Sequence, residues 1–443
     1  MAMRQDVVRL LIADDVGIGK TIEAGLIASE LLALGEAHGL AVLCSPALAE
    51  QWREELRTKF GLEAELVLSS TVTRLSRELI GDESIFDHYP ITVVSTDFIK
   101  SDRHRYEFLR TCPDLVIVDE AHTAVATEGP GGRARQQRYE LVRELAADRQ
   151  RHLLLVTATP HSGKDETFRN LIGLLDDGLH DINLEATAER SRLASYFVQR
   201  RRADIRRYLD EDTPFPKDRQ TKEASYSLTP AYRDVFDDVL NYARETVRTP
   251  EGGLARRVNW WSALALLRAL ASSPRAAAQT LLTRSATVGV DSEAEADAIG
   301  RAVVLDHADD EAIESADATP GADTAADGPR NALQRRLRGF AGAVAKLEGK
   351  DAKLDLAATE VKKLLADSYE PVVFCRFIDT AEYVADHLKK VLRGVTVECV
   401  TGTLPPSERA DRIAALGRIE GKRVLVATDC LSEGINLQDL FHA

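Results

Sequence analysis

Residues 13–21 read A-D-D-V-G-I-G-K-T, and this stretch decides how the rest of the chain is interpreted. An apolar run over residues 7–13 leads into it and predicts a buried strand, while apolar residues recur at helical spacing over residues 21–34. A strand, a tight glycine-bearing turn and a helix N-terminus form a cradle for phosphate, because backbone N–H groups and the positive end of the helix dipole face the anion. A glycine turn that only ends a strand is the alternative interpretation.

The side chains of this stretch predict separate tasks in binding a nucleotide. Lys20 would reach the β- and γ-phosphates, and the Thr21 hydroxyl would bind Mg²⁺. The pattern G-x-x-x-x-G-K-[ST] has glycine where this chain has Asp14, so the match departs from it at one position. The predicted phosphate-binding residues are Asp15, Gly17, Ile18, Gly19, Lys20 and Thr21.

An acidic pair follows another apolar run. Residues 115–118 read L-V-I-V and predict a strand, and D-E-A-H follows directly at residues 119–122. Ligands bind open α/β sheets at the carboxyl ends of the strands. Asp119 would hold Mg²⁺ through its water shell, and Glu120 would orient and deprotonate the water that attacks the γ-phosphate. An acidic pair that only caps a helix is the alternative.

Two further polar segments end predicted strands. Residues 157–160 read T-A-T-P, and the hydroxyls of Thr157 and Thr159 would sense the γ-phosphate and pass its state to neighbouring loops. An ordinary polar turn before proline is the alternative there. Residues 427–438 read A-T-D-C-L-S-E-G-I-N-L-Q and end a strand in a second α/β half, where their carboxylates and amides would face a nucleotide or a sugar–phosphate backbone.

Composition places the chain among ordinary soluble globular proteins. Its 443 residues suffice for two or three domains, and 44% are hydrophobic and 29% charged. The five cysteines include no C-x-x-C pair, which favours reduced thiols in the cytoplasm and argues against a disulfide framework or structural zinc. The apolar runs fall short of the ~20 residues of a membrane span, and the first predicted strand leaves no room for a signal peptide.

The net charge of −14 does not exclude a nucleic-acid partner. Residues 291–327 hold twelve acidic residues and one basic residue, so this segment alone carries −11. The rest of the chain is therefore close to neutral, at about −3. One segment sets the overall charge, and the charge of the other residues leaves the choice of partner open.

Strands that alternate with helices predict an α/β fold with parallel sheets in two halves. The predicted segments are a first lobe at residues 1–160, a helical extension at 161–211, a linker at 212–228, a helical insertion at 229–287, an acidic disordered insertion at 288–330 and an incomplete second lobe at 331–443. A basic cluster within residues 200–207 is interpreted as a solvated helix surface that balances nearby acids, with DNA contact as the alternative.

The motifs, taken in order, resemble those of a known family. The set consists of A-D-D-V-G-I-G-K-T-I-E-A-G, V-D-E-A-H, T-A-T-P-H, F-C-R-F and A-T-D-C-L-S-E-G-I-N-L-Q. It is similar to the two-lobed motor of superfamily-two helicases of the Swi/Snf type. The bacterial branch of that family includes an RNA-polymerase-recycling ATPase and the helicase-like subunit of an anti-phage defence system (DISARM). Members of the family commonly carry an acidic pair before G-x-G-K-T, as Asp14 and Asp15 do here.

The resemblance implies two RecA-like lobes with ATP and Mg²⁺ in the cleft between them and double-stranded DNA across both. The residues implied in coupling the lobes are Thr157, Thr159, Glu433, Gly434 and Asn436. The residues implied in DNA binding are Pro46, Gln51, Ser95 and Thr96 of the first lobe and Arg376, Thr401 and Gly402 of the second. Contacts to the phosphate backbone carry no sequence information, which suits a motor that moves along any duplex.

The leading hypothesis is an ATP hydrolase, stimulated by DNA, that moves along duplex DNA and remodels protein–DNA complexes. A nucleotide-gated DNA-binding or assembly subunit with little turnover and a strand-separating helicase are the alternatives. RNA polymerase or subunits of a bacterial defence complex are the implied protein partners. The resemblance also implies an arginine-bearing motif beyond Ala443 and an adenine-reading glutamine before Met1, because Gln5 lies too close to the first strand for that role.

Overall fold

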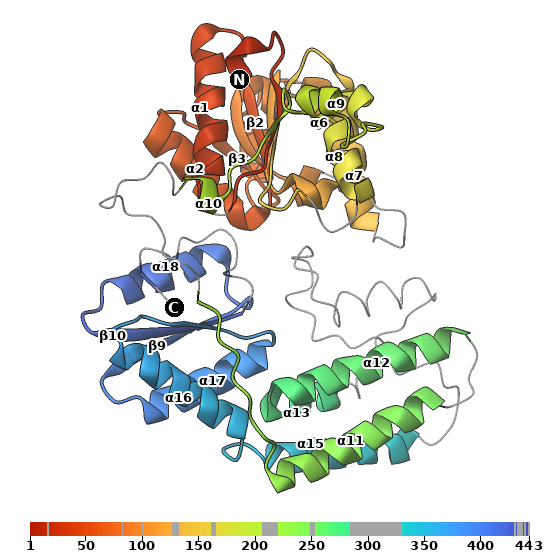
Figure 1. The fold of residues 1–443 in the computed structure, drawn as a ribbon, viewed down its shortest axis with the longest axis vertical. Helices are drawn as coiled ribbons and strands as arrows, with labels where there is room; N and C mark the ends of the chain where they lie inside the picture. Colours follow the sequence, from red (N-terminus) through yellow and green to blue (C-terminus); the bar gives the residue numbers. More distant parts are fainter. Residues whose placement is uncertain are drawn as a thin grey trace. The chain divides into compact units, whose positions relative to one another are not determined.

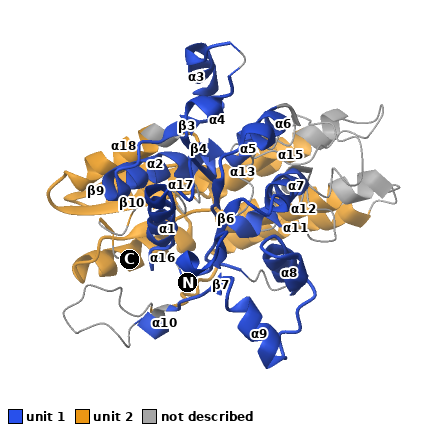
Figure 2. Cartoon of the chain, turned by 90° about the horizontal axis from the view of Figure 1, so that it is seen from above, with its two compact units in different colours: residues 1–218 blue, residues 219–443 orange. Residues whose placement is uncertain are grey.

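The structure, a computed structural model, describes residues 1–15, 17–81, 83–99, 102–125, 133–160, 165–205, 220–248, 253–283 and 330–428, together with Leu431, Leu437, Leu440 and Phe441. The chain forms two compact units, Met1–Asp218 and Arg219–Ala443 (Figure 2). The division between the units falls inside the segment 212–228 that the sequence predicts as a linker. No helix in the described ranges is both long and apolar enough to cross a bilayer.

The first unit is built on a seven-stranded sheet whose paired strands all run parallel, in the order β3-β4-β2-β5-β6-β1-β7. The central strands are buried on both faces, which explains why they are continuous apolar runs. The strands are β1 Arg9–Ile12, β2 Leu40–Cys44, β3 Glu65–Val67, β4 Ile91–Ser95, β5 Leu115–Val118, β6 His152–Val156 and β7 Phe197–Val198.

Helices cover both faces of this sheet, with α1 and α2 on one face and α6, α7 and α8 on the other (Figure 1). The α-helices are α1 Lys20–Leu34, α2 Pro46–Phe60, α3 Val72–Glu78, α4 Ile85–His88, α5 Thr96–Ile99, α6 Asp102–Thr111, α7 Arg133–Ala147, α8 Asp165–Gly173, α9 Thr187–Leu193 and α10 Arg202–Ile205. Short 3₁₀ turns lie at η1 Ala2–Arg4, η2 Ala121–Ala124 and η3 Asp177–Leu179.

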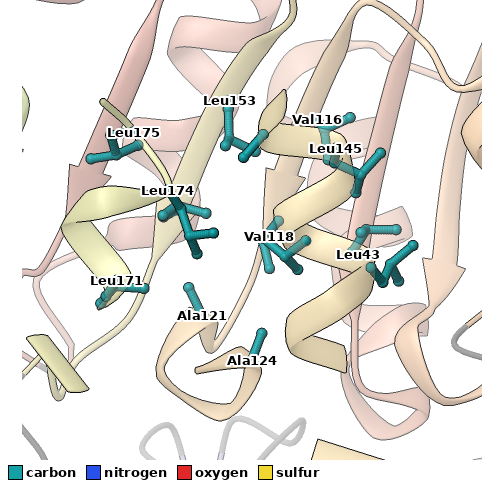
Figure 3. Close-up of a cluster of buried hydrophobic side chains, with 14 of the residues drawn as sticks. Leu43, Val116, Val118, Ala121, Ala124, Leu145, Leu153, Leu171, Leu174 and Leu175 are labelled. Carbon is teal, nitrogen blue, oxygen red and sulfur yellow. The ribbon is translucent and has the colours of Figure 1, made fainter. Parts of the chain in front are cut away.

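The core between the sheet and α7 holds the turn that follows β5. Val118 of β5 and Leu145 of α7 belong to one buried cluster, and Ala121 and Ala124 of η2 complete it (Figure 3). These two alanines are 1% and 2% exposed, so apolar packing against the core holds the D-E-A-H turn. The turn therefore has a fixed place at the carboxyl edge of the sheet.

The predicted helical extension at residues 161–211 also contributes a strand. β7 pairs in parallel with β1, with Leu11 opposite Phe197 and Ile12 opposite Val198. The interpretation of the segment as helical throughout is corrected here, because two apolar residues between polar neighbours are too few to give a periodic signal. The extension completes the first sheet on the side of the phosphate loop.

The second unit contains a helical part built from α11 Pro230–Arg248, α12 Gly253–Ser272, α13 Pro274–Thr283 and α15 Arg330–Ala345. All four helices contribute to one buried cluster, which includes Tyr232, Leu270, Leu281 and Val344. Within the predicted helical insertion at 229–287, the structure ends α12 at Ser272 and begins α13 at Pro274. Pro274 lacks the N–H that a helix interior requires, and the Ser273 hydroxyl accepts from the amide of Ala276 at the new N-terminus.

Helix α15 belongs to this helical part, although the sequence assigns residues from 331 onward to the second lobe. Its apolar face packs against α11 and α13. The helical pattern in the sequence does not show which neighbours such a face will contact. The α/β part that follows has the parallel strand order β8-β10-β9. Its elements are α16 Ala352–Ala366, β8 Val372–Phe374, α17 Ile378–Val391, β9 Val395–Val400, α18 Pro406–Gly417 and β10 Lys422–Ala427. The predicted acidic insertion at 288–330 lies outside the described residues, except for Arg330.

Polar contacts join the helical part to this α/β part. The Lys353 ammonium donates to the carbonyl oxygens of Ala271 and Ser272 at the end of α12, at 3.0 and 3.2 Å. The Thr380 hydroxyl lies 2.9 and 2.8 Å from those of Ser272 and Ser273. The break between α12 and α13 is thus the point at which the helices attach to the second sheet.

Candidate active site

The phosphate loop connects β1 to α1 at the carboxyl edge of the first sheet. Gly17 and Gly19 have φ angles of 82° and 108°, which side chains other than glycine rarely adopt. Gly19 is the N-cap of α1 and supplies no side-chain acceptor, so the first amides of the helix remain for an anion. The amides of Asp15 and Ile18 are engaged elsewhere, donating to the carbonyl oxygens of Arg200 at 3.0 Å and of Asp15 at 3.3 Å.

Lys20 is the first residue of α1, and its ammonium is close to the loop backbone. Its Nζ donates to the carbonyl oxygen of Asp14 at 3.1 Å. Thr21 follows in the first turn of the helix and is partly exposed. The structure therefore brings the predicted lysine and hydroxyl to the same end of the loop. Val16 lies outside the described residues.

Asp119 follows β5 at the same edge of the sheet. Its Oδ2 accepts a hydrogen bond from the Trp52 indole nitrogen of α2 at 2.7 Å, and its Oδ1 accepts from the Glu120 amide at 2.9 Å. Burial and then the neighbouring Glu120 carboxylate raise the pKa of Asp119 to about 6, while Trp52, the Glu120 amide and Lys20 oppose that rise. The Trp52 indole thus ties the D-E-A-H turn to α2.

Glu120 has the left-handed backbone conformation, with φ 45° and ψ 48°. This conformation is uncommon for a residue with a side chain, and such strain gathers at functional sites. The buried alanines of η2 stabilise the turn that imposes it. The strained residue is the one that the sequence predicts as the catalytic base.

A chain of polar contacts leads from Glu120 to the T-A-T-P segment. The His122 Nδ1 atom lies 3.2 Å from Glu120 Oε2 and 2.8 Å from the Thr157 hydroxyl. That hydroxyl accepts from the Thr159 amide at 3.1 Å, and the Thr157 amide donates to the carbonyl oxygen of Ile12. The two motifs are therefore in direct contact through His122. His161 lies outside the described residues.

The donor set at this edge fits magnesium. Asp119 offers a half-buried carboxylate whose pKa is raised mainly by desolvation of its charge, and Thr21 offers a hydroxyl. Mg²⁺ binds few protein oxygens and completes its octahedron with waters and substrate phosphates. One carboxylate and one hydroxyl beside a phosphate loop match that preference.

Gln5 lies at the opposite end of β1 from the phosphate loop. Its side-chain amide donates to the carbonyl oxygen of Ser195 and accepts from the amide of Arg9, both at 2.7 Å. It is engaged at the amino edge of the sheet, whereas the loop lies at the carboxyl edge.

The predicted DNA-binding residues of the first lobe follow β2 and β4 at the carboxyl edge of the sheet. Pro46 begins α2, and the Gln51 amide donates to Glu55 at 2.9 Å. Ser95 is only 3% exposed, and its hydroxyl accepts from the Phe98 amide at 3.4 Å. The Thr96 hydroxyl donates to the carbonyl oxygen of Cys44 at 3.1 Å. Their common edge agrees with a shared surface, but the hydroxyls of Ser95 and Thr96 already serve the local backbone.

The predicted residues of the second lobe follow β8 and β9. Arg376 is exposed after β8, and Thr401 is buried directly after β9. The Thr401 hydroxyl lies 2.8 Å from that of Thr403, and the carbonyl oxygen of Gly402 accepts from Arg409 at 3.1 Å. The predicted coupling residues Glu433, Gly434 and Asn436 lie outside the described residues.

Sequence reasoning missed two side chains that contact the site. Trp52 reads as one apolar position of an amphipathic helix, and nothing in its local pattern indicates a hydrogen bond to Asp119. Arg200 reads as part of a basic surface, but it pairs with the buried Asp14 next to the phosphate loop. Arg200 is exposed and balances nearby acids, as the interpretation of the basic cluster expects, but one of those acids is buried beside the phosphate loop. Arg206 and Arg207 lie outside the described residues. The only hint of this pairing in the sequence is Asp14 itself, which stands where the phosphate-loop pattern has glycine.

Two protein families match the chain, one over its N-terminal part and one over its C-terminal part. Residues 2–162 match the family described as type III restriction enzyme, res subunit, and residues 356–442 match the helicase conserved C-terminal domain. The first match contains the phosphate loop, the D-E-A-H turn and T-A-T-P. The second contains the strands β8, β9 and β10.

The chain is also similar to curated relatives over part of its length. It is 33% identical over 177 residues to the RNA polymerase-associated protein RapA of Proteus mirabilis strain HI4320, which is 40% of this chain and 18% of that protein. The RapA of Yersinia pestis strain Pestoides F is 35% identical over 175 residues, or 39% of this chain and 17% of the relative. The matched region therefore spans less than a fifth of either relative.

Solved structures were matched over most of the chain at low identity. The Hef helicase domain of Pyrococcus furiosus has a TM-score of 0.47 and 16% identity, covering 97% of this chain and 85% of that one. The SWI2/SNF2 ATPase core of Sulfolobus solfataricus in complex with dsDNA has a TM-score of 0.37 and 15% identity, covering 95% and 74%.

The two family matches and the similarity to RapA support the same class of protein, a helicase-like ATPase of superfamily two. The similarity to RapA over part of the chain supports the Swi/Snf type within that class.

Proposed function

We propose that this chain hydrolyses ATP and uses the energy to move along double-stranded DNA. The observation that carries the proposal is the meeting of the phosphate loop, the Asp119–Glu120 pair and the T-A-T-P segment at one edge of the first sheet. A binding cradle, an acidic pair and a link to a third segment are what a nucleotide-driven motor needs. The two family matches support the same interpretation.

Each residue of the site has a defined task in this proposal. The first amides of α1 and the Lys20 ammonium bind the β- and γ-phosphates. Thr21 and Asp119 hold Mg²⁺, which neutralises phosphate charge when it is bound there. Glu120 accepts a proton from the attacking water, and its strained turn fixes the direction in which its carboxylate points. His122 carries the state of Glu120 to Thr157.

The DNA substrate and the protein partners are also part of the proposal. The Sulfolobus SWI2/SNF2 ATPase core was solved in complex with dsDNA, and RapA is an RNA polymerase-associated protein. Duplex DNA is therefore the first ligand to test, and RNA polymerase is the first protein partner. An association with a bacterial defence complex stays a prediction from the resemblance.

ATP turnover with and without duplex DNA tests the proposal. We expect duplex DNA to raise turnover by the purified full chain. Lys20→Ala should weaken nucleotide binding, and Glu120→Gln should keep binding but lower turnover by at least a hundredfold, as loss of a general base does.

Two results would contradict the motor. One is turnover that duplex DNA does not raise, and the other is turnover that survives both substitutions. Nucleotide-dependent DNA binding without turnover would favour the binding-subunit alternative instead. Arg192→Gln is a suitable control. Arg192 pairs with Asp176 at 2.7 Å, and this ion pair does not lie at the carboxyl edge of the sheet.

A further inference from the structure

Asp14 is completely buried at the position where phosphate loops of this pattern have glycine. A buried carboxylate requires a paired cation and hydrogen bonds, since its desolvation is otherwise uncompensated. The structure supplies both through Arg200, which lies 186 positions further along the chain. The departure from the pattern is therefore tied to a specific partner.

Arg200 contacts Asp14 with its backbone and its side chain. The Arg200 amide donates to Asp14 Oδ1 at 2.7 Å, and the guanidinium Nε donates to Oδ2 at 2.8 Å. The guanidinium Nη2 also donates to Oδ2. The carbonyl oxygen of Arg200 in turn accepts from the Asp15 amide at 3.0 Å. Both carboxylate oxygens are thereby engaged, and the backbone entering the loop is fixed to Arg200.

The same guanidinium reaches the other side of the loop. Its Nη2 pairs with the carboxylate of Glu23, which lies in the first turn of α1. Arg200 therefore bridges the residue that precedes the phosphate loop and the helix that follows it. The parallel pairing of β7 with β1 holds the backbone of Arg200 in place, because β7 ends at Val198, two residues earlier.

We propose that Arg200 is a positioning residue for the phosphate loop, which it clamps between Asp14 and Glu23. This inference rests on the proposed nucleotide binding at the loop. The segment after T-A-T-P, which contains Arg200, would then help to shape the nucleotide site directly. Lys20 donates to the carbonyl oxygen of Asp14, so a shift of Asp14 also displaces the ammonium that binds phosphate.

Equilibrium binding of a fluorescent ATP analogue with Mg²⁺ to the full chain tests the clamp. We expect Arg200→Gln to raise the Kd at least tenfold, and to raise KM far more than it lowers kcat. Arg200→Lys should recover part of the affinity, because a lysine keeps the charge but cannot form the forked contact. Arg192→Gln is the matched control, since Arg192 is similarly exposed, at 50% against 46%, and pairs with Asp176 in the same segment.

A double substitution shows whether the two side chains act together. In Asp14→Asn/Arg200→Gln no buried charge is left without its partner, so this variant should stay folded even if Arg200→Gln does not. We expect its loss of affinity to be smaller than the sum of the two single losses. Thermal unfolding of every variant separates a change in the site from loss of the fold.

Three results would overturn the clamp: unchanged affinity in Arg200→Gln, an equal loss in Arg192→Gln, or strictly additive losses in the double variant. A wild-type chain that binds the analogue but does not hydrolyse ATP would overturn the proposed hydrolysis and leave the clamp standing. A wild-type chain that binds no nucleotide would overturn both.

Discussion

Asp119 is half-buried beside a second carboxylate, and desolvation and that neighbour raise its pKa from 3.8 to about 6. A raised pKa means that the folded protein binds the proton more tightly than the unfolded chain does between these two pH values. The free energy of unfolding therefore falls as pH rises from about 4 to about 6, and the loss persists at higher pH. One pKa unit corresponds to ~1.4 kcal/mol, so a rise from 3.8 to about 6 corresponds to a loss on the order of 3 kcal/mol.

Asp119→Asn should remove this dependence on pH. Asparagine keeps the shape of the side chain and a carbonyl acceptor for Trp52 or for the Glu120 amide. We expect the variant without nucleotide to exceed wild type in stability at pH 7 and to lose that advantage near pH 4. Thermal unfolding of both proteins across this range measures the difference.

Asp114 serves as a control, because its pKa is shifted in the opposite direction to that of Asp119. Burial acts to raise its pKa, but the side chain of His38 and the amides of His38 and Gly39 more than offset burial and lower it. This carboxylate stabilises the folded state at neutral pH, and that contribution is lost as pH falls through the folded-state pKa. Asp114→Asn should therefore be less stable than wild type at pH 7. A pH-independent difference between wild type and Asp119→Asn would contradict our account of Asp119.

The chemistry-bearing residues of the site could be predicted because they are local. Lys20 and Thr21 stand in one short pattern, and Asp119 and Glu120 directly follow a strand. Trp52 and Arg200 could not be predicted, because their partners lie 67 and 186 positions away and no local periodicity encodes such contacts. The left-handed backbone of Glu120 was equally hidden, since it arises from the packing of η2 into the core.

Among the elements, long apolar strands and amphipathic helices were predictable, and short edge strands were not. β5 coincides with the predicted run at residues 115–118, and β1 lies within the predicted run at 7–13, because burial on both faces demands unbroken apolar sequence. β3 and β7 have three and two residues, too few for a pattern to emerge. They are held by pairing with β4 and β1, which is a tertiary effect.

Packing between α1 and α2 depends on a glycine in the middle of α1. A Cβ atom at Gly25 would lie 2.3 Å from the Phe60 ring at the end of α2. We expect Gly25→Ala to destabilise the protein by about 1–3 kcal/mol, the usual cost of overpacking. In the Phe60→Ala background the same change should be neutral or stabilising, since alanine favours a helix by about 1 kcal/mol over glycine.

Chemical denaturation of the four proteins in this cycle measures the coupling. Gly339→Ala in α15 is the control, because nothing lies within 4 Å of a Cβ added there. That change should leave stability unchanged or raise it slightly. If Gly25→Ala lowers stability by the same amount with and without the Phe60 ring, the clash with that ring is not the cause of the loss.

For the whole molecule, the two family matches fall in different units and in the order of a two-lobed motor. The type III restriction match lies in Met1–Asp218 and the helicase C-terminal match in Arg219–Ala443. The helical part of the second unit is connected to its sheet through the contacts of Lys353 and Thr380. Movement on DNA would require nucleotide state in the first unit to change how the second unit holds DNA.

Displacement of a third strand from a DNA triplex tests the proposed movement on duplex DNA most directly. The full chain should release the third strand from the duplex only when ATP and Mg²⁺ are present, and Glu120→Gln should release none. A forked duplex without a third strand should remain paired under the same conditions. Release that is equal without ATP or in Glu120→Gln, or strand separation of the fork, would contradict an ATP-driven translocase on double-stranded DNA.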